Sequence, residues 1–382
     1  MNLSDHWQMN PQIDFLNHGS FGATPTIVLE AQHKFRDSLE FDPIQFLAPE
    51  RDLESKLDAV REAIAKLVHA SATDLAFVRN ATDGVNAVVR SLPLNAGDEV
   101  VCTNHGYNAC SNALQFAAEA SGAQVRVAKI PFPITTGEQV VEAIESTFNQ
   151  RTRLLLVDHV TSPTALVFPL KDIIERCHAR DIRVLVDGAH ALGMLPLNLA
   201  ELKPDYYTAN HHKWLCGPKA SGFLYVRSDL QNEVRPTVIS HGANRSPAGR
   251  SRFLTEFDWV GTYDPTPLLA MPSAIDFLNS LMPGGIAELM SSNHELAVRA
   301  QESLCAALRI EAPAPSSMLG SMASLPINRG LDASVLQSKL FHEHRFEVPV
   351  FEWSEGGLLR VSLQAYNHWD QIERLAEVLR ST

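Results

Sequence analysis

The chain has 382 residues, of which 45% are hydrophobic and 20% are charged, and its formal net charge is −12. This length and composition are typical of a globular protein with a large core and more than one domain. The negative charge argues against a nucleic-acid-binding protein, because phosphates require clustered Lys and Arg side chains. No apolar run reaches the ~20 residues that a membrane span needs.

The N-terminal stretch and the cysteines indicate the compartment. Residues 1–15 contain neither a basic segment nor an apolar segment of the kind found in secretory leaders, so we expect a cytoplasmic protein. The five cysteines are scattered and lack CxxC spacing, which predicts reduced, buried thiols rather than disulfides or a zinc site. They are Cys102, Cys110, Cys177, Cys216 and Cys305.

The segment 79-RNATDGVNAVV-89 carries the signature of a helix N-terminus. Ala81, Thr82 and Asp83 stand at the start of its apolar helical pattern. Free backbone N–H groups and the helix dipole make such a place a site for an anion, and a phosphate would suit it. An ordinary helix cap is the alternative interpretation.

Apolar, strand-like runs alternate with helical patterns through the middle of the chain. The runs lie at 98–105, 124–130, 153–160 and 182–189. Nearly continuous Val, Ile and Leu indicate strands buried on both faces. We therefore predict an α/β fold with a mostly parallel central sheet covered by helices, and we expect catalytic groups at the strand ends.

Two motifs at predicted strand ends carry the polar residues of interest. The run 183-RVLVDGAHALG-193 places Asp187 and His190 after a buried strand, where a carboxylate needs a positive charge or hydrogen-bond donors. The run 206-YYTANHHKWLCGPKASGFLYVR-227 places Lys213 in an apolar setting, where a lysine can lose its proton and act as an amine nucleophile. A capping role for Asp187 is the alternative, and so is a metal site that uses His211 and His212.

The pattern changes after about residue 263. Long helical stretches, a Pro-Gly-Gly break and a closing helix predict a smaller α/β domain, so we divide the chain into 1–262 and 263–382. The predicted helices lie at 267–281, from the break to about residue 308, and at 368–380. Within this part, Arg360 stands in an apolar strand pattern. Its guanidinium is suited to a substrate carboxylate or to an interdomain salt bridge.

These candidates match the needs of pyridoxal 5′-phosphate. That coenzyme requires an amine for covalent attachment, a carboxylate beside its ring nitrogen, a donor-rich phosphate site and a flat group against its ring. Lys213, Asp187 and the helix start at residues 81–83 meet the first three requirements. Tyr107, just beyond the predicted strand at 98–105, is the candidate for the fourth, although it can equally well be a residue packed at the start of the next helix.

The motifs VDGAHALG and NHHKWLCGP resemble the signature of aminotransferase class V, in the isopenicillin N epimerase-like branch that also contains carbon–sulfur lyases. The resemblance extends from FLNHGSFGATP at 15–25 through WVGTYDPTP at 259–267 to LLRVSLQAYN at 358–367. It implies a fold-type I pyridoxal-phosphate-dependent transferase, with a large domain, a smaller α/β C-terminal domain and a homodimeric assembly.

The resemblance also implies roles for the central residues. Lys213 would bind the coenzyme covalently and move the Cα proton, and Asp187 would pair with the pyridinium nitrogen. His190 would face the phenolic oxygen or the covalent link, unless it is an ordinary core histidine. His212 would contact the phosphate. Arg360 would bind the substrate carboxylate.

Further roles follow for residues at other strand ends. Tyr107 would lie over the pyridine ring, with His105 as the second candidate. Thr161 and Ser162 would face the phenolic oxygen of the coenzyme.

Two segments would complete the site from elsewhere. Gly261 and Thr262 would reach the phosphate of the partner subunit, so that the two sites of the dimer are shared. Asn17, His18 and Ser20 belong to a segment that would fold over the site, with Asn17 and His18 contacting the substrate. An ordinary glycine-rich loop is the alternative for this segment.

The resemblance leaves the reaction outcome open. The first hypothesis is an epimerase or racemase that labilises the Cα–H bond of an amino-acid-type substrate. A carbon–sulfur β-lyase acting on cysteine, a cysteine conjugate or a sulfoxide comes second, and an aminotransferase third. An inactive cofactor-fold protein and a metal-binding protein are the non-enzymatic alternatives. A persulfide-forming desulfurase is disfavoured, because Cys305 stands far before Arg360 in an apolar helical pattern.

Overall fold

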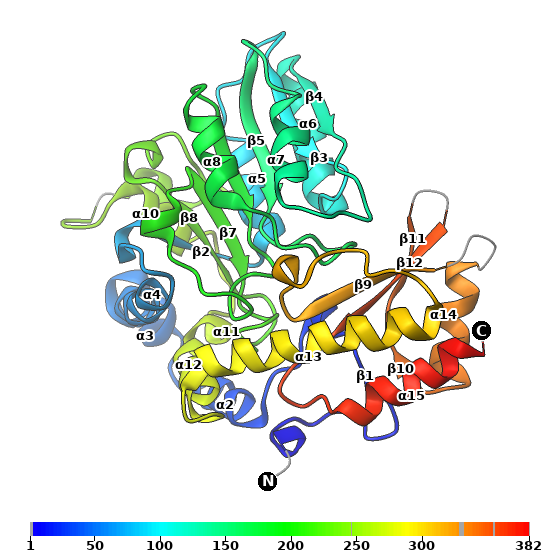
Figure 1. Ribbon diagram of the computed structural model, residues 1–382. Coiled ribbons are helices and arrows are strands. Elements are labelled where there is room, and N and C mark those ends of the chain that lie inside the picture. The colour runs from blue at the N-terminus through cyan, green and yellow to red at the C-terminus, as the bar shows by residue number, and fades with distance from the viewer. Residues whose placement is uncertain (1–2, 246, 328–331, 354–355, 382) are drawn as a thin grey trace.

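The computed structural model describes residues 3–245, 247–327, 332–353 and 356–381. Within these residues the largest sheet has seven strands (Figure 1). β8 is antiparallel to both of its neighbours, whereas the strands from β7 to β4 run parallel. The predicted mostly parallel sheet is therefore confirmed. In spatial order the strands are β2 (Leu75–Val78), β8 (Gly222–Val226), β7 (Tyr206–Asn210), β6 (Arg183–Asp187), β5 (Thr152–Asp158), β3 (Glu99–Thr103) and β4 (Gln124–Ala128).

Helices cover both faces of this sheet. Alternate strand residues face two separate hydrophobic clusters, as Leu155 and Val184 do on one face and Leu154 and Leu185 on the other. Burial on both faces explains the uninterrupted Val and Leu runs of the central strands. The helices on the first face include α7 (Glu138–Glu145) and α8 (Leu170–His178), and those on the second include α5 (Ala81–Val89), α6 (Asn108–Ser121) and α10 (Arg252–Asp258).

The four predicted apolar runs correspond to β3, β4, β5 and β6. The structure differs from the expectation of full burial at β4, whose residues are mostly exposed or half-buried. β4 is the edge strand, so one side of it has no neighbouring strand in the described sheet. Its Val residues reflect strand propensity more than burial.

A second α/β part contains a three-stranded antiparallel sheet and the predicted C-terminal helices. The N-terminal segment joins this part, because β1 (Asp14–Phe15) pairs with β10 (Phe346–Glu347). The boundary at residues 262 and 263 remains a prediction. The strands of the sheet are β11 (Val350–Trp353), β12 (Gly356–Ser362) and β9 (Met322–Ile327). The helices are α11 (Thr266–Leu269), α12 (Met271–Ser280), α13 (Gly285–Leu308), α14 (Ala333–His342) and α15 (Trp369–Arg380).

The long α13 crosses below the large sheet and runs beside β9 (Figure 1). Near the first residues of α13, helix α2 packs against α11 and α12 (Figure 1). No helix in the described part of the chain is long and apolar enough to cross a membrane. The remaining helices are α1 (His18–Phe21), α2 (Thr26–Phe41), α3 (Pro43–Leu47), α4 (Glu54–Val68) and α9 (Leu199–Leu202).

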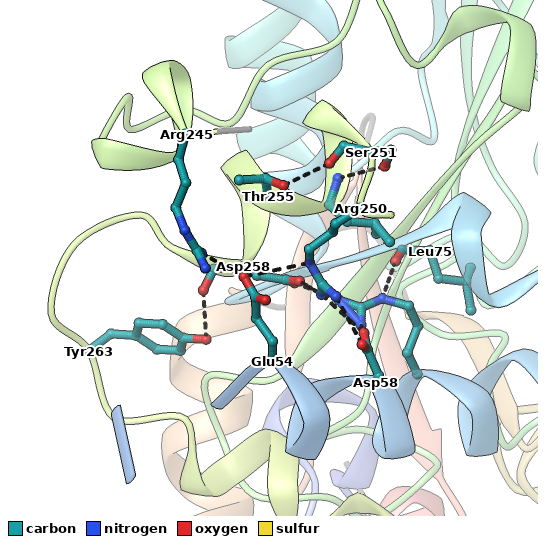
Figure 2. A network of polar contacts seen from close by, with 11 residues as sticks. Glu54, Asp58, Leu75, Arg245, Arg250, Ser251, Thr255, Asp258 and Tyr263 are labelled. Carbon is teal, nitrogen blue, oxygen red and sulfur yellow. Dashed lines mark hydrogen bonds and ion pairs between the residues drawn. The ribbon is translucent and has the colours of Figure 1, made fainter. Parts of the chain in front are cut away.

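An ion-pair network ties α10 to α4 (Figure 2). Asp258 accepts hydrogen bonds from Arg61, at 2.5 Å, and from Arg250. Arg250 also pairs with Asp58 at 2.9 Å. Tyr263 donates its hydroxyl proton to the Asp258 carbonyl at 3.3 Å. Buried charges are tolerated when they are paired in this way. The hydrogen bond of Tyr263 ties the loop that follows α10 back to the last residue of that helix.

Candidate active site

Lys213 lies in the turn after β7, and its side chain is buried. Its Nζ is 2.9 Å from Nε2 of His190, which stands in the loop after β6. The two residues meet because β6 and β7 are adjacent parallel strands whose carboxyl ends share one edge of the sheet. The structure therefore brings together the two motifs that the sequence analysis singled out.

The hydrogen bonds of His190 suit an unprotonated Lys213. The indole nitrogen of Trp214 can only donate, and it lies 3.4 Å from Nδ1 of His190. A neutral His190 ring then carries its proton on Nε2, from which it donates a hydrogen bond to Nζ whenever the Lys213 amine is unprotonated. Burial holds the pKa of His190 well below its usual value. Burial, followed by the nearby Arg360, lowers the pKa of Lys213 to about 8.

Asp187 is buried at the end of β6. Its Oδ1 accepts the backbone N–H of Ala189 at 3.0 Å, and its Oδ2 accepts the thiol proton of Cys110 at 3.1 Å. Both oxygens of Asp187 therefore have a hydrogen-bond donor within the protein. This arrangement satisfies the requirement for donors that the sequence predicted for a buried strand-end carboxylate.

A cavity of about 180 Å³ connects these groups. Most of the predicted site residues lie on its wall, although they come from six separate segments of the chain. The predicted residues that line it are Ser20, Ala81, Thr82, Tyr107, Ser162, Asp187, His190, His212 and Lys213.

The N-terminus of α5 forms one wall of the cavity. Asn80 caps the helix by accepting the Asp83 N–H at 3.0 Å, and Asn210 at the end of β7 accepts the Ala81 N–H at 2.9 Å. Thr82, between these two tied positions, faces the cavity. The predicted helix start is therefore correct in position, and side chains already satisfy two of its N–H groups.

His212 contributes a polar atom without a partner. Its Nδ1 is buried and has no hydrogen-bond partner, while the residue lines the cavity. Burial and then the nearby Lys213 lower the pKa of His212 to about 4, so the ring is neutral. A buried polar atom left unsatisfied costs about 1–3 kcal/mol. A polar ligand in the cavity would remove this cost.

Arg360 is buried beside the cavity and has neutral partners. Its Nη1 donates to the carbonyl and hydroxyl of Ser162, at 2.6 and 3.2 Å, and its Nη2 donates to the hydroxyl of Ser20 at 3.1 Å. Its Nε has no partner. Burial lowers the pKa of Arg360 to about 10. In the described part of the chain no carboxylate pairs with it, so the interdomain salt bridge, the alternative interpretation, is not observed there.

Tyr107 and Ser162 lie at the cavity, whereas two residues considered with them do not. Tyr107 stands before the first residue of α6 and is 45% exposed. Thr161 is buried and bonds the hydroxyl of Thr164 at 2.7 Å instead of facing the cavity. His105 bonds Thr164 as well, at 2.7 Å, and lies behind the site. The structure thus places Tyr107, and not His105, on the wall of the cavity.

Asp83 is not placed at the cavity. Its carboxylate accepts the backbone N–H and Nε–H of Arg79, both at 3.3 Å, and the hydroxyl proton of Thr237 at 2.8 Å. The side chain is therefore directed to the outer side of the helix start. The predicted coenzyme contact by Asp83 has no support in this arrangement, because the chain supplies its own donors to that carboxylate.

The N-terminal segment is also arranged differently from the prediction. His18 donates from Nε2 to the Lys213 carbonyl at 2.9 Å and accepts the Tyr366 hydroxyl proton at Nδ1, at 2.7 Å. Both ring nitrogens are therefore used within the protein, and His18 orients the lysine turn rather than a substrate. Asn17 donates to Glu347 at 3.0 Å and lines a neighbouring groove of about 1120 Å³. Neither side chain lines the small cavity.

Gly261 and Thr262 lie away from the cavity of their own chain. Thr262 lines a separate cavity of about 210 Å³. Both residues belong to the loop that the hydrogen bond of Tyr263 ties back to α10 (Figure 2). Their contact with the phosphate of a partner subunit remains a prediction.

The sequence analysis missed Asp158, Cys110 and Asn210. Asp158 lines the cavity at the end of β5, in register with Asp187. The signal was present, because the two predicted strand runs both contain Leu-Val-Asp. Asn210 is the last residue of β7, a strand that the sequence analysis did not predict. Cys110 gave no signal beyond its place in a helical pattern.

The described residues give little support to the two alternative chemistries, a metal site and a nucleophilic cysteine. The described residues contain no group of three His, Cys, Asp or Glu side chains suited to a metal ion. His211, a member of the alternative metal set, packs against the rings of Phe77 and Phe223. All five cysteines are free and buried, as predicted. Cys305 lies within α13, and burial raises the pKa of its thiol to about 11, which disfavours a nucleophilic role.

Comparisons with known proteins identify the family. Residues 24–375 match the family described as aminotransferase class-V. An isopenicillin N epimerase of Amycolatopsis lactamdurans is 35% identical over 393 residues, which cover 99% of this chain and 97% of the epimerase. A probable chloroplastic L-cysteine desulfhydrase of Arabidopsis thaliana is 28% identical, over 97% of this chain and 83% of the desulfhydrase.

A solved structure shows the same fold. A mutant of the protein C-DES, with glycine covalently linked to its PLP cofactor, superposes with a TM-score of 0.83 over 99% of this chain and 98% of that chain. The two sequences are 22% identical, so the likeness concerns the fold. The predicted fold-type I architecture is confirmed.

Proposed function

The chain belongs to the aminotransferase class-V family of pyridoxal-phosphate-dependent enzymes, and we propose that it labilises the Cα–H bond of an amino-acid-type substrate and epimerises that carbon. The observation that carries this proposal is the buried amine of Lys213, whose pKa is lowered to about 8 and which lies 2.9 Å from His190 in the same cavity as Asp187. An amine of this kind can both bind a carbonyl carbon and take a proton from carbon. The identity to isopenicillin N epimerase supports epimerisation as the outcome.

The residues of the cavity fit pyridoxal 5′-phosphate. Asp187 would pair with the ring nitrogen, and Lys213 would bind the coenzyme covalently. The start of α5 and the unpartnered Nδ1 of His212 would hold the phosphate. Tyr107 would supply the flat group against the ring. When bound, the coenzyme supplies an electron sink that acidifies the Cα–H bond of the substrate.

The chain itself supplies proton transfer, orientation and shielding from water. Lys213 would accept the Cα proton at Nζ on one face of the substrate, and inversion would require a proton to be delivered to the opposite face of that carbon. The Nε2 of His190 lies 2.9 Å from the free Nζ and would orient it. Arg360 would orient the substrate through its α-carboxylate. Because these groups are buried, their charges and hydrogen bonds act more strongly than they would in water.

A carbon–sulfur β-lyase is the second candidate, and the desulfhydrase relative is the finding that favours it. Removal of the Cα proton is common to both reactions, so the same cavity serves either one. The outcome depends on whether the substrate carries a leaving group on its β-carbon and on which face of Cα receives the proton.

A panel of amino acids tests the proposed function. The purified protein, loaded with coenzyme, is incubated in deuterium oxide with L- and D-amino acids and with cysteine conjugates. We expect deuterium at Cα together with formation of the opposite enantiomer. Release of pyruvate and sulfide instead of inversion would select the lyase. Absence of exchange with every substrate, in a protein that binds coenzyme, would refute both.

We further propose a homodimer in which Gly261 and Thr262 complete the coenzyme site of the partner. Apolar side chains exposed on α2 and α3 support an interface there: Phe41 is 91% exposed and Ile44 is 65% exposed. The Tyr263 hydroxyl donates to the Asp258 carbonyl across the Gly261 loop, at 3.3 Å, and so ties its two ends together. Sedimentation of the holoenzyme at micromolar concentration should give the dimer mass. A monomer with full coenzyme affinity would contradict the shared site.

We propose that the protein is located in the cytoplasm. Its five cysteines are free and buried, which suits a reducing compartment. We therefore assign no disulfide-dependent step to the folding of this protein.

Replacing Arg360 with Lys tests how the substrate is oriented. The variant keeps the charge and replaces a planar donor with a point charge, so a carboxylate loses an aligned hydrogen bond worth about 1.5–3 kcal/mol. We expect kcat/KM for carboxylate substrates to fall about ten- to hundredfold, while the absorbance of the bound coenzyme is unchanged.

The matched control is Arg299→Lys, because Arg299 stacks on Trp369 on the helices of the C-terminal part. This variant should keep its kcat/KM. If Arg360→Lys lowered the melting temperature and left kcat/KM within about twofold, Arg360 would be a structural tie between Ser20 and Ser162 only.

A further inference from the structure

Asp158 gives the cavity a second carboxyl group. It ends β5 as Asp187 ends β6, and the two residues are register partners in adjacent parallel strands. Register partners point to the same face of a sheet. Both line the 180 Å³ cavity, and they are only 5% and 3% exposed. Two buried carboxyl groups this close resist ionising together, because like charges repel and water is excluded.

The hydrogen bonds indicate which of the two carries the charge. Asp187 accepts a hydrogen bond at each oxygen, from the Ala189 N–H and from the Cys110 thiol. Hydrogen bonds donated to a carboxylate favour its charged form. Burial, and next the charge of Asp187, raise the pKa of Asp158 well above its usual value and outweigh its backbone hydrogen bonds and the charge of Lys213, which lower it.

The other titratable groups around Asp158 do not compensate a second negative charge. They are Cys102 of β3, Cys110 of α6 and Lys213 after β7. Burial raises the pKa of both thiols, that of Cys102 to about 11, so both are neutral. Lys213 lowers the pKa of Asp158, but by less than burial and the charge of Asp187 raise it.

We propose that Asp158 and Asp187 form a carboxyl pair in which Asp158 keeps a proton and Asp187 keeps the charge, so that a single negative charge faces the coenzyme ring. Asp158 is then a positioning residue that acts through Asp187 and Lys213. A second negative charge would favour the protonated form of Lys213 and so oppose covalent attachment of the coenzyme. This inference depends on the coenzyme, and it is independent of which reaction follows.

Asp158→Asn is the decisive variant, because an amide has nearly the shape of a protonated carboxyl group. We measure the dissociation constant of pyridoxal phosphate and the midpoint pH of the absorbance of coenzyme bound to Lys213. With Asp158 neutral, the variant should keep its dissociation constant within about threefold and keep the midpoint. Asp187→Asn, which removes the charge, should weaken coenzyme binding at least about tenfold.

The result that would overturn the proposal has a definite sign. If Asp158 were ionised, Asp158→Asn would remove an anion near Lys213, and the midpoint would move to lower pH. Such a shift, or a tenfold weaker dissociation constant, rejects the carboxyl pair. Because neither measurement uses a substrate, failure of the epimerase hypothesis leaves the test intact.

Infrared spectroscopy of the coenzyme-free protein provides a second measurement. The carbonyl band of a protonated carboxylic acid should be present at neutral pH and smaller in Asp158→Asn. Asp74→Asn is the matched control, since burial raises the pKa of Asp74 too, outside the cavity. If Asp158→Asn does not fold, the wild-type protein still decides. A wild-type spectrum without any protonated carboxyl band at neutral pH would reject the pair.

Discussion

Lys213→Ala is expected to abolish covalent coenzyme attachment and to slow Cα–H exchange by at least about 10³-fold, because the variant loses both the nucleophile and the base. Trp214 donates a hydrogen bond to Nδ1 of His190, and Nε2 of His190 lies within hydrogen-bond distance of Lys213 Nζ. These contacts orient the wild-type amine for both roles. Its pKa of about 8 makes the free amine far more populated near neutral pH than it is in an ordinary lysine. The measurement is borohydride reduction followed by peptide mapping, together with exchange in deuterium oxide.

The matched control for this variant is Lys219→Ala. Lys219 is the next lysine along the chain, and its Nζ donates to the Gly22 carbonyl at 3.0 Å and to the Thr24 hydroxyl at 3.4 Å. It therefore ties the N-terminal segment and has no place in the cavity. Its variant should remain covalently labelled. If the Lys213→Ala variant were still labelled at Lys219, Lys219 rather than Lys213 would be the site of coenzyme attachment.

The centre of the site was predictable because it depends on the periodicity of one sheet. Asp187 and Lys213 follow adjacent parallel strands, and the ends of such strands meet at one edge. The same reasoning applies to Asp158, whose strand run contains the same Leu-Val-Asp sequence. It was missed because one carboxylate sufficed for the coenzyme, and the sequence analysis assigned no role to a second.

Residues whose partners lie far along the chain were harder to predict. His18 bonds Tyr366, and its other nitrogen bonds the Lys213 carbonyl, so its position depends on how three distant segments pack. The Asp83 side chain is held outside the cavity for a local reason, since Arg79 donates to one of its oxygens and Thr237 to the other. Spacing predicts that a polar residue stands at a helix start, but it cannot show which side chain satisfies it.

The C-terminal part illustrates both cases. Its long helices followed from their apolar periodicity, and α13 and α15 appear where the patterns predicted them. The pairing of β1 with β10 was not predicted, because two-residue strands leave no pattern in a sequence. Arg360 was found from its chemistry rather than its spacing, since a guanidinium in an apolar strand requires an acceptor.

Asp187→Ala is expected to lower the rate of Cα–H exchange by about 10²–10³-fold. The ring nitrogen of the coenzyme loses its anionic partner and with it the proton that makes the ring an electron sink. The coenzyme-free protein should lose little stability, because the substitution removes the buried carboxylate. Only two donors, the Cys110 thiol and the Ala189 N–H, then lose their hydrogen-bond acceptor.

Cys110→Ala is the control, because it removes one donor to Asp187 and keeps the carboxylate. It should retain exchange within about tenfold. Exchange is followed by loss of the Cα proton signal in deuterium oxide, and melting temperature is measured on the same samples. Exchange near the wild-type rate in Asp187→Ala, with coenzyme still bound, would show that this carboxylate supports the strand end and not the chemistry.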